Sequence, residues 1–77
     1  MSIEEKLTSV LLEILDVEEK DITPTAHLIN DLGASSVDLV EIVAGVENEF
    51  DIDISDKDAQ TIRTVQALID YIKKSTS

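Results

Sequence analysis

The sequence predicts an all-α fold, a small bundle of three main helices plus one short helix, with a long loop between the first two main helices. Three segments carry apolar residues at helical spacing, and each begins near a capping residue. A chain of 77 residues forms one domain, residues 1–77, with room for a single small core. The three apolar stripes must therefore face one another, because none can be buried alone.

The first helix is predicted over residues 3–15. Ser2 and Glu5 have the spacing of a capping box, in which the Ser2 hydroxyl accepts from the Glu5 amide and Glu5 reaches back. Its apolar positions recur at helical spacing and are Ile3, Leu7, Val10, Leu11 and Ile14. Residues 16–35 then form the long connection, because Thr23-Pro24 argues against a continuous helix. We expect this loop to pack over the core, because it carries the apolar anchors Val17, Ile22, Leu28, Ile29 and Leu32. A connection of such length is unusual in a small domain and often functional.

The only histidine of the chain, His27, lies in this loop. A single imidazole without a cysteine or a second histidine is poorly suited to bind a metal ion. We therefore expect His27 to be a surface or half-buried loop residue.

The second helix is predicted over Ser36–Phe50. Its apolar stripe contains Leu39, Val43, Val46 and Phe50, widened by Ile42 and Val40, and its opposite arc is polar with Asp38, Glu41, Asn48 and Glu49. Gly45 is unexpected inside a helix, where glycine costs roughly 1 kcal/mol relative to alanine. It either permits a close approach by a partner or is simply tolerated.

Residues 51–56 alternate acidic and apolar side chains and are predicted to be an extended connector, since no other segment would pair with them as a strand. A short helical turn follows near Asp56–Gln60. Three connector residues match EF-hand ligand positions, but Asp56 and Ile62 stand where that loop needs glycine and a bidentate glutamate, so we predict no dedicated metal site. Weak, nonspecific binding of divalent ions by the clustered carboxylates remains an alternative. Thr64 can cap the last helix, whose apolar positions are Val65, Leu68, Ile69 and Ile72.

The composition and charge of the chain indicate which kinds of partner the protein binds and where it is found. Seventeen acidic residues against 6 basic ones give a net charge of −11, which repels nucleic acid and anionic lipid and favours basic patches on partner proteins. The N-terminus is acidic where a signal peptide is basic, and no apolar run reaches the roughly 18 residues that span a bilayer. We expect a cytoplasmic monomer that does not insert into membranes.

Ser36 begins the predicted second helix, and three interpretations of it are possible. A catalytic serine needs an adjacent base, and the chain has one loop histidine and no Gly-x-Ser-x-Gly motif, so we predict that the protein is not an enzyme. Ser35 or Ser36 could serve only as a helix cap. Alternatively, the partial positive charge of the helix N-terminus suits a phosphate-linked group attached there.

The run Asp31-Leu32-Gly33-Ala34-x-Ser36, followed by Val37-Asp38-x-Val40-Glu41, resembles the attachment motif of acyl carrier proteins. The resemblance covers essentially the whole chain. It implies that Ser36 receives 4′-phosphopantetheine from coenzyme A through a separate phosphopantetheinyl transferase. It also implies that the thiol of this arm carries acyl intermediates as thioesters for fatty acid, lipid or polyketide biosynthesis, which accords with a chain that has no cysteine.

The same resemblance implies roles for other residues. The second helix would meet basic surfaces of synthases, reductases and acyltransferases, with Asp38, Glu41 and Glu47 as the recognition residues. The acyl chain would shelter between helices, and its candidate lining residues, each of which could equally be plain core, are Val43, Val46, Ile54, Ala59 and Ile62.

The chain departs from the family pattern at Ser35, where aspartate usually precedes the modified serine. Two adjacent hydroxyls therefore compete for the attachment, and the spacing after Gly33 favours Ser36. Ala44 and Asn48 replace a larger side chain and an acid, which indicates a specialised carrier. A carrier of amino acids and an unmodified acidic adaptor remain the alternatives.

Overall fold

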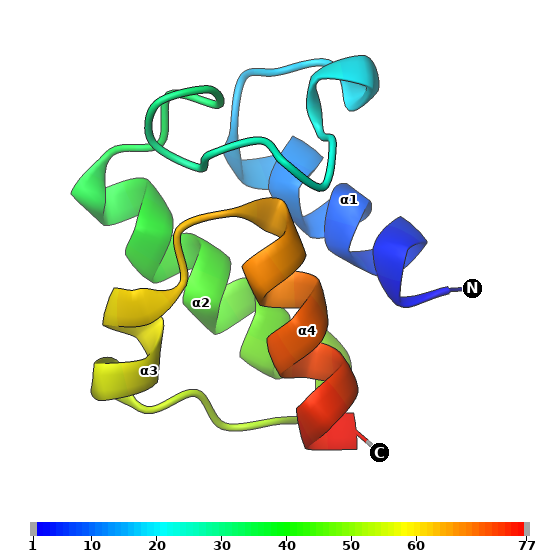
Figure 1. Ribbon diagram of the computed structural model, residues 1–77, viewed down its shortest axis with the longest axis vertical. Helices are drawn as coiled ribbons and strands as arrows, with labels where there is room; N and C mark the ends of the chain where they lie inside the picture. Colours follow the sequence, from blue (N-terminus) through cyan, green and yellow to red (C-terminus); the bar gives the residue numbers. More distant parts are fainter. Residues whose placement is uncertain (1, 77) are drawn as a thin grey trace.

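The computed structural model describes residues 2–76 and contains four α-helices and one 3-10 helix. The elements are α1 (Ile3–Ile14), η1 (Glu19–Asp21), α2 (Ser36–Phe50), α3 (Asp56–Thr61) and α4 (Val65–Thr76). Helices α1, α2 and α4 form the bundle, and α3 lies on the side away from α1 (Figure 1). The predicted all-α fold is confirmed, with η1 as an element that the sequence analysis missed. None of the helices within residues 2–76 has the length and apolarity needed to cross a membrane.

The core is built from three helices and the long loop. The fully buried side chains are Leu7, Leu11, Leu28, Ile42, Val46, Leu68 and Ile72. One part of the predicted α2 stripe is wrong, because Val40 is 70% exposed. Each helical residue advances about 100°, so Val40 lies about 200° around the helix from the buried Ile42 and faces away from the core.

Gly45 lies where α2 crosses α1. A Cβ atom added to Gly45 would stand 2.9 Å from Val10 Cγ1 and 3.7 Å from Ile14 Cδ1, both on α1. The first distance is shorter than carbon atoms tolerate, so glycine at this position lets the two helices pack closely. The close approach that Gly45 permits is therefore made by a helix of the same chain.

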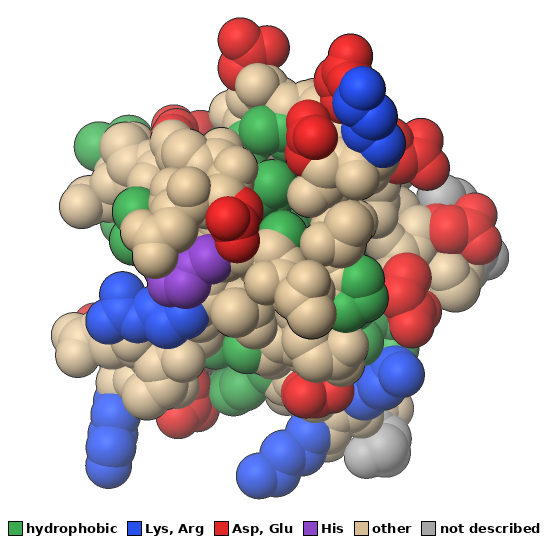
Figure 2. Space-filling model, turned by 45° about the horizontal axis from the view of Figure 1, so that its top comes forward, with side chains coloured by type: hydrophobic (Ala, Val, Ile, Leu, Met, Phe, Trp, Pro, Cys, Tyr) green, Lys and Arg blue, Asp and Glu red, His purple; other side chains and the backbone are tan. Residues whose placement is uncertain are grey.

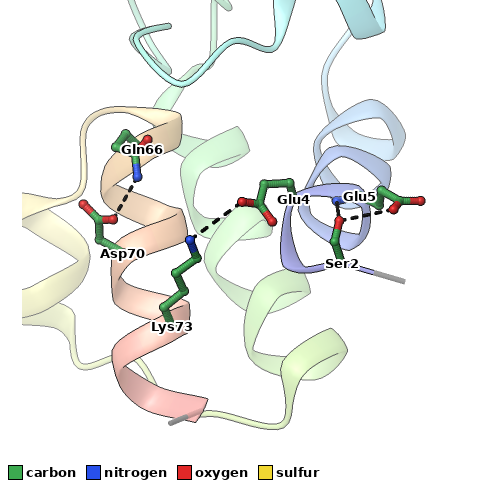
Figure 3. Close-up of polar contacts among 6 residues, drawn as sticks. All are labelled: Ser2, Glu4, Glu5, Gln66, Asp70 and Lys73. Carbon is green, nitrogen blue, oxygen red and sulfur yellow. Dashed lines mark hydrogen bonds and ion pairs between the residues drawn. The ribbon is translucent and has the colours of Figure 1, made fainter.

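The start of α1 is capped by its own residues and is joined to α4 by an ion pair (Figure 3). Ser2 Oγ accepts a hydrogen bond from Glu5 N at 3.1 Å, as predicted, but the Glu5 carboxylate accepts from the Ser2 hydroxyl at 3.3 Å instead of from the Ser2 amide. Lys73 Nζ lies 3.8 Å from Glu4 Oε2 and connects α4 to α1. Both side chains are solvent-exposed, so this pair contributes at most about 1 kcal/mol.

The long loop packs over the end of the bundle, as the sequence predicted (Figure 1). Leu28, Leu32 and Ala34 are buried, and they anchor the loop to the core. His27 is half-buried, as expected, and its Nδ1 accepts hydrogen bonds from the amides of Ile29 and Asn30 at 3.2 and 3.1 Å. Its ring therefore stabilises the turn that leads toward α2.

Candidate functional site

The N-terminus of α2 is closed by a complete capping box. Ser35 is the N-cap residue, and its Oγ accepts a hydrogen bond from Asp38 N at 3.1 Å. The Asp38 carboxylate accepts in return from Ser35 N at 3.0 Å. Of the two adjacent serines, Ser35 is thus the one that caps the helix. The Ser35 hydroxyl can replace the carboxylate of the usual aspartate as the cap, because both groups are good N-cap acceptors.

Ser36 is the first residue of α2, and its side chain is exposed. Among the residues that the structure describes, its hydroxyl has no hydrogen-bond partner. The first-turn amides of the helix lie at the same end and carry partial positive charge, which favours an attached phosphate. Ser36 therefore has the accessibility and the electrostatic setting that a phosphodiester linkage needs.

The residues before the serines hold this end of α2 in place. Asp31 Oδ2 accepts from His27 N at 2.6 Å, and Gly33 adopts a φ of +72°, a left-handed conformation that suits glycine. Ala34 is buried, and its amide donates to Leu28 O at 3.0 Å. The motif that precedes Ser36 thus has a structural role, in that it fixes the position of the exposed serine.

The exposed face of α2 beyond Ser36 is apolar as well as acidic. Val37 and Val40 are 66% and 70% exposed, and Glu41 and Ala44 are also exposed. Glu41 was predicted on this face from the sequence, but the two valines were not. Their signal was available, since positions 37, 40 and 44 share one helical face.

The three predicted recognition carboxylates differ in their surroundings. Glu41 is exposed and makes no side-chain hydrogen bond within residues 2–76. Asp38 belongs to the capping box, and Glu47 Oε2 accepts from Ile54 N at 2.9 Å, which ties α2 to the connector before α3. Acidic side chains are spread over the face seen in Figure 2, whereas most of the few basic ones reach out from its lower half.

A groove of about 590 Å³ lies between α2 and α3. Four of the five predicted lining residues border it, namely Val43, Ile54, Ala59 and Ile62. Val46 is instead completely buried in the core and is absent from the lining. The other lining residues were not predicted from the sequence; they are Leu39, Val40, Ala44, Glu47, Asp56, Gln60 and Arg63.

Helix α3 forms one wall of the groove and is held by polar contacts from its neighbours. The Tyr71 hydroxyl on α4 donates to Asp58 Oδ2 at 3.0 Å and lies 3.4 Å from Asp53 O. The hydrogen bond to Asp58 raises the pKa of Tyr71 above its usual 10.0, helped by desolvation and by the charges of nearby carboxylates. Glu47 holds the connector before α3 in place by accepting the hydrogen bond from Ile54 N.

The acidic connector before α3 has structural roles in the described residues. Asp51 is the left-handed C-cap of α2, with φ 55°, and Ser55 Oγ caps α3 by accepting from Asp58 N at 3.1 Å. Nowhere in residues 2–76 do three or more His, Cys, Asp or Glu side chains come together in a way that could hold a metal ion.

Comparison with known proteins identifies a family and a fold. Residues 5–72 match the family model described as the phosphopantetheine attachment site. The chain is also similar to the solved structure of "a putative acyl carrier protein" from Mycobacterium tuberculosis, at 34% sequence identity and a TM-score of 0.88. That match covers 95% of this chain and 97% of the other.

Proposed function

This chain belongs to the acyl carrier protein family, whose members carry a covalent 4′-phosphopantetheine and are not enzymes, and from that premise we propose that Ser36 is the attachment residue. The observation that carries this proposal is that the two adjacent serines have different surroundings. Ser35 Oγ is occupied as the helix cap, whereas Ser36 is exposed and its hydroxyl has no partner in the described part of the chain. The first-turn amides of α2 also suit the phosphate of a phosphopantetheine arm at Ser36. The chain has no cysteine, which is compatible with an arm that brings its own thiol.

The α2–α3 groove supports a role in sheltering the acyl chain. When bound, the arm supplies a thiol that holds an acyl group as a thioester. Val43, Ile54, Ala59 and Ile62 offer an apolar lining, and removing apolar surface from water contributes about 25 cal/mol per Å². The position of α3, and with it the width of the groove, depends on the contacts of Tyr71 and Glu47.

We assign partner recognition to the exposed face of α2. Glu41 can attract lysine or arginine on a phosphopantetheinyl transferase or on synthases, reductases and acyltransferases of fatty acid, lipid or polyketide biosynthesis. The exposed Val37 and Val40 add apolar contact area beside Ser36. Asp38 and Glu47 contribute to the same negative potential while they hold the local structure. The proposal places the protein in the cytoplasm as a monomer.

The test is an intact mass measurement after incubation with coenzyme A and a broad-specificity phosphopantetheinyl transferase. We expect a gain of one phosphopantetheine by the native protein and no gain by Ser36→Ala. Ser35→Asp is the matched control, because aspartate keeps the N-cap acceptor but removes the competing hydroxyl, and it should be modified normally. A gain that survives in Ser36→Ala contradicts the assignment, and no gain with several transferases favours the unmodified adaptor.

A further inference from the structure

Arg63 is the only arginine in the chain and the only one of the 6 basic residues that lines the α2–α3 groove. It follows directly after Ile62, the C-cap of α3, and it is exposed. Within residues 2–76 its guanidinium takes part in no ion pair or hydrogen bond, whereas Lys20 and Lys73 are each paired with a glutamate. In a chain of net charge −11, this cation borders an apolar groove and has no carboxylate partner among the described residues, so it is available to an anionic ligand in the groove.

Arg63 lies at the end of the groove nearest the start of α2. Its carbonyl oxygen accepts from Leu28 N at 2.9 Å, and the Leu28 carbonyl oxygen accepts from Ala34 N at 3.0 Å. Ala34 precedes Ser36 by two residues. These two backbone hydrogen bonds hold the backbone at Arg63 close to the segment that leads into Ser36.

The groove is electrostatically polarised along α3. Asp56 begins this helix of 6 residues, which is about 9 Å long, and Arg63 follows its end, so the acidic and the basic lining residue lie at opposite ends of α3. The Glu47 carboxylate, which also lines the groove, is bound to the amide of Ile54. An anion tethered at Ser36 therefore meets the positive end of the groove first.

We propose that Arg63 binds an anionic oxygen group, phosphate or carboxylate, that belongs to the arm attached at Ser36. The inference rests on the proposed function and deepens it. The planar guanidinium donates paired hydrogen bonds that match both phosphate and carboxylate oxygens. The anion has two possible sources, the phosphodiester that links the arm to Ser36 and a carboxylate on the acyl group. Arg63 is thus a positioning residue for the arm or a specificity residue for acidic acyl groups.

The test follows the Arg63 Nε–H signal by NMR, which is unambiguous because the chain has one arginine. Four forms are compared: the unmodified protein, the protein with the bare arm, and the butyryl and succinyl forms. Butyryl and succinyl groups have the same carbon chain length and differ in the terminal carboxylate. Intact mass first verifies each form, so a failure of loading refutes the proposed function before Arg63 is tested.

The pattern of shifts identifies the source of the anion. A shift that appears with the bare arm and does not change further assigns the phosphodiester, and a shift confined to the succinyl form assigns the acyl carboxylate. An Arg63 signal at the same position in all four forms overturns the inference.

Variants provide a second readout that does not depend on any partner enzyme. Lys57→Gln is the matched control, because Lys57 is an exposed cation of α3 that does not line the groove. With a phosphodiester ligand, Arg63→Gln moves the phosphorus NMR signal of the arm and Lys57→Gln does not. With a carboxylate ligand, Arg63→Gln releases the succinyl group from the groove, so hydroxylamine cleaves its thioester about two- to five-fold faster, the range expected for an exposed charge pair. Cleavage of the butyryl form is unchanged by Arg63→Gln. Equal behaviour of the two variants in both assays also refutes the role of Arg63.

Discussion

Replacing Gly45 with alanine tests the close packing of α1 against α2. The added methyl group would lie 2.9 Å from Val10 Cγ1, and Val10 is itself buried, so the helices or the Val10 side chain must move. Forcing an extra carbon into a packed core costs about 1 to 3 kcal/mol. Alanine returns roughly 1 kcal/mol through its higher helix propensity. The expected net effect is a destabilisation of about 1 kcal/mol, which lowers the melting temperature by about 4 to 8 °C in a domain of this size.

The measurement is thermal and urea unfolding followed by circular dichroism. Ala44→Gly, at the exposed neighbouring position, measures the propensity difference in the same helix without the packing conflict. In a Val10→Ala background the obstructing Cγ1 is gone, so Gly45→Ala should then stabilise the protein. If Gly45→Ala raises the melting temperature in the native background, the helices do not approach as closely as the structure indicates.

Three further perturbations have defined outcomes. The absorbance of Tyr71, the only tyrosine, should titrate with a midpoint above 10.0, and Asp58→Asn should lower that midpoint. Because the pKa of Tyr71 is raised in the folded protein, the contact with Asp58 stabilises the fold below pH 10, and this stabilisation is lost as the pH rises through the folded pKa. Ser35→Ala should cost about 1 kcal/mol of unfolding free energy in urea titrations, and Ser35→Asp should restore it, unless the cap contributes nothing. Glu41→Lys should weaken binding to partner enzymes in titrations while helicity stays constant, whereas Glu13→Lys on α1 should not; equal binding by both variants would remove Glu41 from the interface.

Local sequence patterns were sufficient for most of the fold. The apolar spacing of α1, α2 and α4 located these helices to within one residue at the ends of α1 and α2, because a 3.6-residue period is visible without knowledge of the partner helix. The same reasoning misplaced Val40, since a count of apolar residues does not say which edge of a wide stripe faces the core. The 3-10 helix Glu19–Asp21 was missed because it lies in polar sequence and is held by its own capping contacts.

The sequence by itself determined the family resemblance, the position of Ser36 after a glycine turn, and the absence of any thiol from the chain. These are properties of neighbouring residues, so they can be read without coordinates. Tertiary structure decided which serine is the cap, why Gly45 is tolerated, and that Val46 is core while Arg63 borders the groove. The last three depend on contacts between segments far apart in the chain, or on which face of a helix another element covers. The cap is a local contact of Ser35 with Asp38, and it is decided by the backbone geometry at the start of α2, which two adjacent serines in the sequence leave open.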